Sequence, residues 1–137
     1  MAEKITIQAH VNAPMATVWT CWTEPEHVTQ WNNASPDWHT PSASNDLRVG
    51  GTFLYRMEAK DGSFGFDFGG TYMVVDTKKR IVYVMGDGRE VDNQFSEGTD
   101  GVDITIIFDA ETQNPIDMQR AGWQSILDNF KKYTESN

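Results

Sequence analysis

NPIDMQRAGWQSILDNFKKY is the sequence of residues 114–133. It is the one long stretch of this chain that clearly indicates an amphipathic helix, and the rest of the fold is expected to form around it. Asn114 can cap its first turn, and Pro115 suits the first helical position, where its missing N–H is not needed. Apolar side chains recur there at three- and four-residue spacing: Trp123, Ile126, Leu127, Phe130 and Tyr133. One face of this helix is therefore expected to be buried against a large apolar surface.

The segments before this helix predict that surface as a sheet. Residues 4–11 alternate between apolar and polar side chains, and residues 14–22 and 23–31 predict two short helices. Further strands are expected at 52–58, 64–75, 81–85, 90–96 and 102–108. Turns this short join antiparallel strands, since parallel pairs need a long crossover. We therefore expect an α+β fold with a six-stranded curved antiparallel sheet, in the order β-α-α-β-β-β-β-β-α.

A loop and a glycine pair predict where the fold is open. Residues 32–46 are rich in Asn, Ser, Pro and Thr and show no sustained period, which predicts a loop. Trp38 lies within it, so the loop is either pinned to the core or acts as a lid. Gly69-Gly70 interrupts a strand, and we expect a bulge or sharp bend there. The open end of the fold is expected where this loop meets the bent sheet.

Length and charge limit the classes of function. The 137 residues correspond to one domain, expected to span residues 1–137. The formal net charge of -9 disfavours nucleic acid and anionic membrane surfaces as partners. Cys21 is the single cysteine and is expected to be a small buried hydrophobe, consistent with a reducing compartment. No leader-like or membrane-length apolar segment is found in the sequence, so we expect a cytoplasmic protein without membrane insertion.

Several short motifs carry a resemblance over nearly the whole chain: Ala13-Pro14, Val18-Trp19, Trp22-Thr23-Glu24-Pro25-Glu26, Gln30-Trp31, Asp46-Leu47-Arg48-Val49-Gly50-Gly51, Gly70-Thr71-Tyr72, Arg80-Ile81-Val82-Tyr83 and Gly122-Trp123. Together they resemble bacterial relatives of the activator of Hsp90 ATPase, within the Bet v 1 and START-like (SRPBCC) helix-grip superfamily. The resemblance implies a hollow between sheet and long helix, used across the superfamily for lipids, sterols, polyketides and other largely apolar molecules. It does not imply one chemistry, because this scaffold hosts carriers, enzymes and protein-binding modules.

The sequence shows no catalytic constellation. His10, His27 and His39 are spread over a strand, a helix and the expected loop, so we expect no metal and no cofactor. Asp46 and Arg48 have two interpretations. Arg48 could orient an acidic group of a ligand, or the two residues could form an ion pair that fastens the loop.

We expect the hollow to be lined by side chains from the loop, the sheet and the last helix. The expected lining residues are Trp31, Trp38, Tyr55, Met57, Phe68, Phe95, Met118, Gly122 and Ile126, with His39 and Arg48 at the mouth. Gly122 is expected where the long helix passes close to another element or borders the hollow, because a mid-helix glycine otherwise costs about 1 kcal/mol relative to alanine.

These observations favour a binding protein for a hydrophobic or aromatic small molecule, as a monomer or weak dimer. The alternative is a chaperone-interaction or stress-response module that resembles the chaperone-activating domain. A third hypothesis is a cyclase- or hydrolase-type enzyme using the same cavity. The third lacks an identified acid or base.

Overall fold

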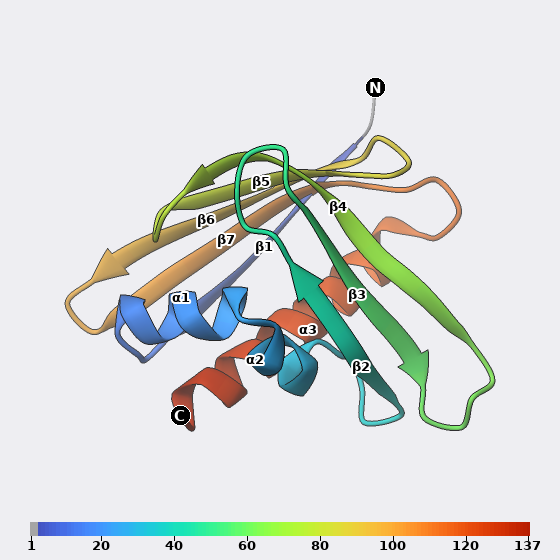
Figure 1. Ribbon diagram of the computed structural model, residues 1–137, viewed down its shortest axis with the longest axis horizontal. Coiled ribbons are helices and arrows are strands. Elements are labelled where there is room, and N and C mark those ends of the chain that lie inside the picture. Colours follow the sequence, from blue (N-terminus) through green and yellow to red (C-terminus); the bar gives the residue numbers. More distant parts are fainter. Residues whose placement is uncertain (1–2) are drawn as a thin grey trace.

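A computed structural model describes residues 3–137 and shows one curled sheet that wraps around three helices (Figure 1). In chain order the elements are β1 (Lys4–Val11), α1 (Met15–Thr23), α2 (Pro25–Trp31), β2 (Trp38–Asn45), β3 (Thr52–Ala59), β4 (Gly65–Asp76), β5 (Arg80–Met85), β6 (Glu90–Gly98), β7 (Gly101–Asp109) and α3 (Ile116–Glu135). The α+β class, the curled antiparallel sheet and the long C-terminal helix are confirmed.

The sheet has seven antiparallel strands in the order β1-β7-β6-β5-β4-β3-β2. From β2 to β7, each strand pairs with the next strand in sequence, as expected of a meander. The first strand, β1, pairs with the last, so that Ile5 lies opposite Phe108 and Val11 lies opposite Val102. Helix α3 packs mainly along β1 and therefore lies nearer to one edge of the sheet than to the other (Figure 1).

The prediction of six strands and of a loop over residues 32–46 is wrong, because Trp38–Asn45 forms strand β2. This edge strand pairs with β3 from Trp38 opposite Ala59 to Asn45 opposite Phe53, with a register shift between His39 and Ser42. Proline is tolerated at bulges and on edge strands, and Pro41 lies within the shift. The strand is held by backbone pairing and shows no regular apolar alternation, so the sequence pattern missed it.

The bulge expected at Gly69-Gly70 lies elsewhere. Both glycines pair in register with β3, and the irregularity in β4 falls between Tyr72 and Val74. The glycines are needed for another reason. A Cβ atom on Gly69 would lie 2.5 Å from the Phe53 carbonyl oxygen, and one on Gly70 would lie 2.7 Å from the Val84 carbonyl oxygen. Close approach of neighbouring backbone therefore explains this pair.

Helix α3 begins at Ile116, with Pro115 rather than Asn114 at the N-cap, and no side chain caps it. The Asn114 carbonyl instead accepts a hydrogen bond from Gln119 Nε2 at 2.8 Å. The expected apolar stripe is confirmed in its centre, where Leu127 and Phe130 are completely enclosed. The sequence therefore predicted the helix and its buried face correctly and misplaced its first turn.

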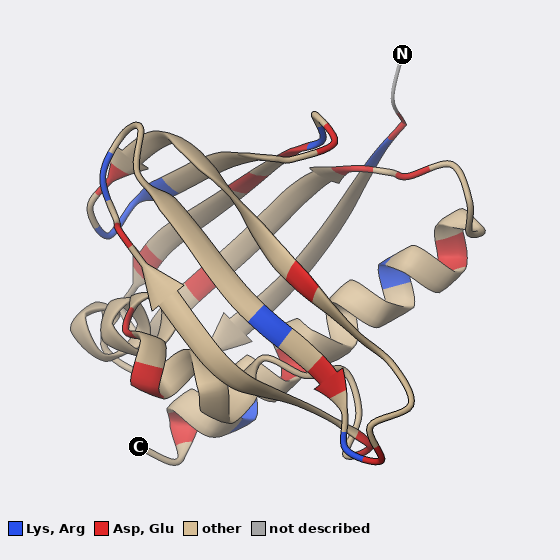
Figure 2. Ribbon diagram, turned by 45° about the vertical axis from the view of Figure 1, so that its right-hand side comes forward, with Lys and Arg blue, Asp and Glu red and all other residues tan. Residues whose placement is uncertain are grey.

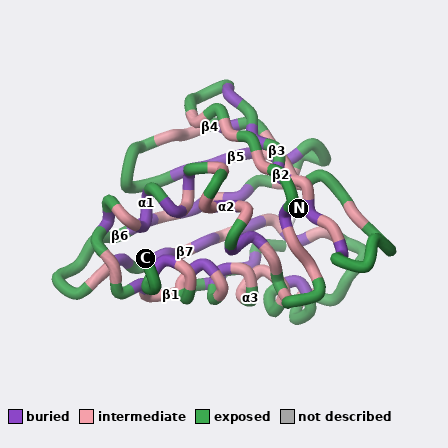
Figure 3. Tube along the Cα trace, turned by 60° about the horizontal axis from the view of Figure 1, so that its bottom comes forward, coloured by how far each residue is buried: buried purple, intermediate pink, exposed green. Residues whose placement is uncertain are grey.

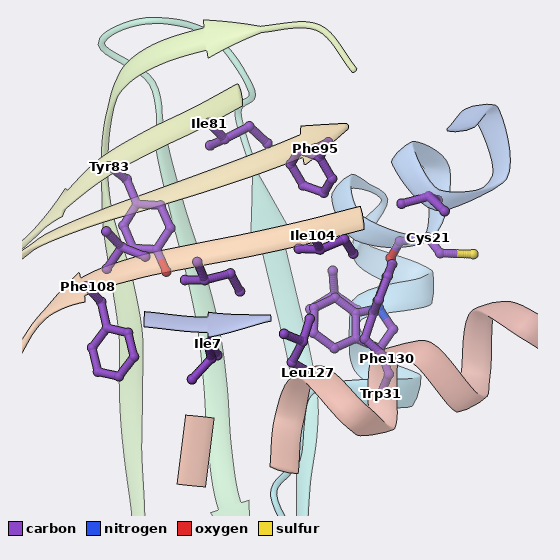
Figure 4. Close-up of a cluster of buried hydrophobic side chains, with 14 of the residues drawn as sticks. Ile7, Cys21, Trp31, Ile81, Tyr83, Phe95, Ile104, Phe108, Leu127 and Phe130 are labelled. Atoms are coloured by element: carbon purple, nitrogen blue, oxygen red, sulfur yellow. The ribbon is translucent and has the colours of Figure 1, made fainter. Parts of the chain in front are cut away.

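The core lies between the concave face of the sheet and the three helices, and the buried residues follow that face (Figure 3). Figure 4 shows Trp31, Leu127 and Phe130 meeting there, opposite Ile104 of β7. Cys21 is buried in α1, as predicted. The two short helices thus close one end of the same core that α3 covers.

Lysine, arginine, aspartate and glutamate residues are spread over strands, turns and helices (Figure 2). Among residues 3–137, the buried polar side chains are all uncharged: Thr23, Asn32, Thr40, Asn93, Gln119 and Thr134. Within the same residues, no helix combines the length and apolar character that crossing a membrane requires.

Candidate functional site

A cavity of about 250 Å³ lies between α3 and the concave faces of β3, β4, β5 and β6. Its walls are the side chains of Trp22, Thr23, Trp31, Asn32, Asn45, Phe53, Tyr55, Met57, Phe66, Phe68, Tyr72, Ile81, Tyr83, Arg89, Asn93, Ile106, Trp123, Ile126 and Leu127. The cavity exists because α3 packs mainly along β1 and diverges from the strands on the other side of the sheet.

The structure brings five of the expected lining residues together around this cavity. They are Trp31, Tyr55, Met57, Phe68 and Ile126. Tyr55 and Met57 share the inward face of β3, where every second residue is buried. Alternation along the strand therefore assigned these side chains to the correct face.

Trp38, which was expected in the lining, and His39 and Arg48, which were expected at the mouth, lie outside the cavity. Trp38 packs on the edge of the sheet, with its ring centre 6.0 Å from that of Phe66. His39 is the next residue along β2 and pairs with Glu58. Arg48 is largely exposed, and its Nε donates to Asp46 at 3.0 Å, so the ion-pair interpretation is confirmed.

Phe95, Met118 and Gly122 also lie outside the cavity. Phe95 points inward but packs edge-on against Trp22, at a ring separation of 5.4 Å, and belongs to the core. Met118 is 61% exposed in the first turns of α3. A Cβ atom on Gly122 would meet nothing within 4 Å, so the expectation that α3 passes close to another element at Gly122 is wrong.

Several lining residues were missed, although alternation could have identified some of them. Phe53 shares the inward face of β3 with Tyr55, and its ring lies between those of Tyr55 and Tyr83, at 4.9 and 4.7 Å. Asn93 occupies an inward position of β6. Arg89 lies before β6, and only the folding of the sheet brings it to the cavity.

A hydrogen-bonded chain joins the cavity wall to the end of α1. The Tyr72 hydroxyl donates to the Asn45 amide oxygen, and Asn45 Nδ2 donates to the Thr23 carbonyl at 2.8 Å. Both ends of the Asn45 amide are therefore used within the protein. This chain ties β2 and β4 to the helices and holds that side of the wall in place.

Three tyrosines from adjacent strands face the cavity: Tyr55, Tyr72 and Tyr83. Burial raises the pKa of each phenol above its ordinary value, because the anionic form would lose its hydration. All three therefore stay neutral and keep their protons at physiological pH. Figure 4 shows Tyr83 projecting from β5 across the inner face of the sheet.

Arg89 is the one cation among the described residues that line the cavity. Its Nε donates to Asp87 at 2.8 Å, and the side chain is 27% exposed. No carboxylate belongs to the cavity wall, and no three His, Cys, Asp or Glu side chains of residues 3–137 gather as a metal-ligand set. The site therefore offers apolar rings, neutral hydroxyls, amides and one guanidinium that is paired with Asp87.

Comparison with known proteins relates this fold to solved structures. The AHSA1-like protein from Aeromonas hydrophila is similar over 98% of this chain and 93% of its own, at 49% identity and a TM-score of 0.92. A protein from Cytophaga hutchinsonii has 50% identity over the same shares of the two chains, at a TM-score of 0.84.

More distant structures share the fold alone. One from Chromobacterium violaceum has 20% identity and a TM-score of 0.85, over 98% of this chain and 99% of its own. No curated protein matches this chain. The family model described as Activator of Hsp90 ATPase homolog 1-like protein matches residues 12–135. The chain therefore belongs to the family of Activator of Hsp90 ATPase homolog 1-like proteins and has its helix-grip fold.

Proposed function

We propose that this protein binds a small, largely apolar aromatic molecule in the cavity between α3 and the sheet. The observation that carries the proposal is the cavity itself, a space of about 250 Å³ walled mainly by aromatic and aliphatic side chains. Binding sites for small molecules are typically concave and apolar, with a few polar groups that set orientation.

The space is unusual for a domain of this size if its role is only structural. Protein interiors pack to the density of organic crystals, and unfilled apolar space lowers stability. Here Phe53, Phe68 and Tyr83 contact one another, at 4.7–6.2 Å between ring centres, and all three also border the open space of the cavity. A flat molecule would recover the missing contacts by packing on these rings.

The chemistry of the wall favours binding over catalysis. A general base needs a pKa near the working pH, whereas burial raises the pKa of Tyr55, Tyr72 and Tyr83 away from it. The remaining ionisable side chain of the wall, that of Arg89, is paired with Asp87. The chaperone-interaction alternative rests on the family description. A cytoplasmic location is proposed because a single cysteine suits a reducing compartment.

The proposal is tested by titrating the protein with N-phenyl-1-naphthylamine, a neutral aromatic probe, while recording amide chemical shifts. We expect the shifts to cluster on β3, β4, β5 and α3. Ile126→Trp places bulk in the cavity and should weaken binding at least about 10-fold. Ser125→Trp is the control, because Ser125 lies on the exposed side of the same helix. Shifts scattered over the surface, or equal binding by both variants, would contradict the proposal.

A further inference from the structure

We infer that Asn93 selects ligands that bring a hydrogen-bond donor, such as an aromatic hydroxyl, into the cavity. This inference rests on the proposed function and deepens it. It identifies the chemical class of the ligand as a hydroxylated or N–H-bearing aromatic rather than a plain hydrocarbon.

Asn93 occupies a position where the sheet otherwise places apolar side chains. Along β6 the inward residues are Val91, Asn93 and Phe95, and all three are buried. The neighbours of Asn93 on adjacent strands are Ile81 and Ile106, which also line the cavity. The polar side chain of Asn93 therefore lies in the cavity wall among apolar side chains and is only 2% exposed.

The amide of Asn93 is oriented by its own strand partner. Its Nδ2 donates to the Ile81 carbonyl at 3.1 Å. The opposite orientation would place the amide oxygen against that carbonyl, so the hydrogen bond determines which end is free. The hydrogen bonds within residues 3–137 include none to the Asn93 amide oxygen. Asn93 Oδ1 is thus an acceptor without a partner in the cavity wall. It is not among the enclosed unpaired side-chain atoms of residues 3–137, which are His10 Nε2 and Thr134 Oγ1, so it is open to whatever occupies the cavity.

Two other polar side chains of the wall, those of Asn45 and Thr23, are bound within the protein. The Asn45 amide is used at both ends, by Tyr72 and by Thr23. The Thr23 hydroxyl donates to the Trp19 carbonyl at 2.7 Å. These residues hold the wall together, whereas the oxygen of Asn93 has no such structural partner.

Tyr83 supplies a complementary group on the neighbouring strand. It lines the cavity as a neutral phenol, and no hydrogen bond of residues 3–137 involves its hydroxyl. A ligand hydroxyl can donate to Asn93 and accept from a phenol, which a hydrocarbon cannot do. Asn93 and Tyr83 together therefore offer the cavity one hydrogen-bond acceptor and one donor.

The expected selectivity arises because binding is weakened when the Asn93 amide oxygen is left without a hydrogen-bond donor. A plain hydrocarbon would displace water from the Asn93 oxygen and put nothing in its place. A ligand with a hydroxyl would replace that water directly. A site built around a hydrogen bond rejects analogues that lack it, even when these are more hydrophobic. The order of affinity should therefore oppose the order of hydrophobicity.

The test compares three ligands of one shape: naphthalene, 2-naphthol and 2-methoxynaphthalene. The last keeps the oxygen and loses the donor. We expect wild-type protein to bind 2-naphthol at least about 10-fold more tightly than either of the others, measured by amide chemical shifts. In Asn93→Leu the affinities for the three ligands should differ by no more than about 2-fold. This variant should also bind naphthalene more tightly than the wild-type protein does. Asn93→Ala should lose the preference in the same way without filling the space.

The controls separate this inference from general effects. Gln94→Leu makes the same change of amide to hydrocarbon at the next residue, which lies outside the cavity wall, and should keep the preference. Equal binding of all three ligands by wild type, or an unchanged preference in Asn93→Leu and Asn93→Ala, overturns the inference and leaves the proposed function standing. If none of the three binds, the proposed function fails together with the inference.

Discussion

The two sides of the concave surface differ in how α3 meets them. On the side of β1 and β7, the Trp123 ring stacks on Phe108, at 4.0 Å between centres and 11° between planes. On the side of β4, the same Trp123 is 6.0 Å from Phe68 and meets it edge-on. The first side is a solid core, and the second is the wall of a cavity.

Polar tethers explain why the helix does not close the gap. Gln124 and Lys131 donate from α3 to backbone carbonyls of β1, at Gln8 and His10. Asn129 donates to the Trp31 carbonyl at the end of α2, at 2.7 Å. Among residues 3–137, the side-chain hydrogen bonds of α3 include none to β3 or β4. The hollow therefore results from one-sided attachment of an otherwise ordinary amphipathic helix.

The largest expected effect is at an enclosed ring of α3 that does not line the cavity. Phe130→Ala should lower the free energy of unfolding by about 3–5 kcal/mol, because this enclosed ring packs on Trp22 and Trp31 at 4.8 and 4.9 Å. Phe68→Ala, in the cavity wall, should cost less than about 3 kcal/mol, since its ring already borders empty space. Denaturant unfolding of both variants measures the difference. Equal losses would show that the two sides are packed alike.

A smaller loss of stability is expected when Gly70, in strand β4 beside the cavity, is replaced. Gly70→Ala should destabilise by about 1–3 kcal/mol, because the added methyl would press on the Val84 carbonyl oxygen and the Tyr83 ring. Gly86→Ala is the matched control, since its Cβ would meet nothing within 4 Å. Thermal unfolding of the pair measures the contrast, and an unaffected Gly70→Ala would mean that β4 and β5 can separate at no cost.

The smallest expected effect is an increase in stability, from a substitution in α3. Gly122→Ala should raise stability by about 0.5–1 kcal/mol, because alanine forms helix better and no neighbouring atom lies within 4 Å of its methyl. The melting temperature should rise while binding of 2-naphthol stays unchanged. A fall in melting temperature would show that α3 lies closer to the sheet than the structure indicates.

The two-residue period of the strands correctly predicted which side chains face inward. Tyr55, Met57 and Phe68 were assigned to the inner face because alternate residues of a strand share a face. Asn93 was missed, although it interrupts the apolar series of Val91 and Phe95, because it was not considered as a buried position. Trp38 was expected to line the cavity. It lies on the edge of the sheet, beside Phe66, and this position does not support that role.

Local periodicity and turn residues specify the long helix, its buried stripe and the antiparallel meander, so these features could be predicted before the structure was known. Motifs spread along the chain also indicated the family. Tertiary structure alone decided that residues 38–45 complete the sheet, because an edge strand is made by backbone pairing with its neighbour. It also decided that α3 attaches to β1 and that Asn93 and Arg89 reach the hollow, because these depend on contacts between residues far apart in the chain.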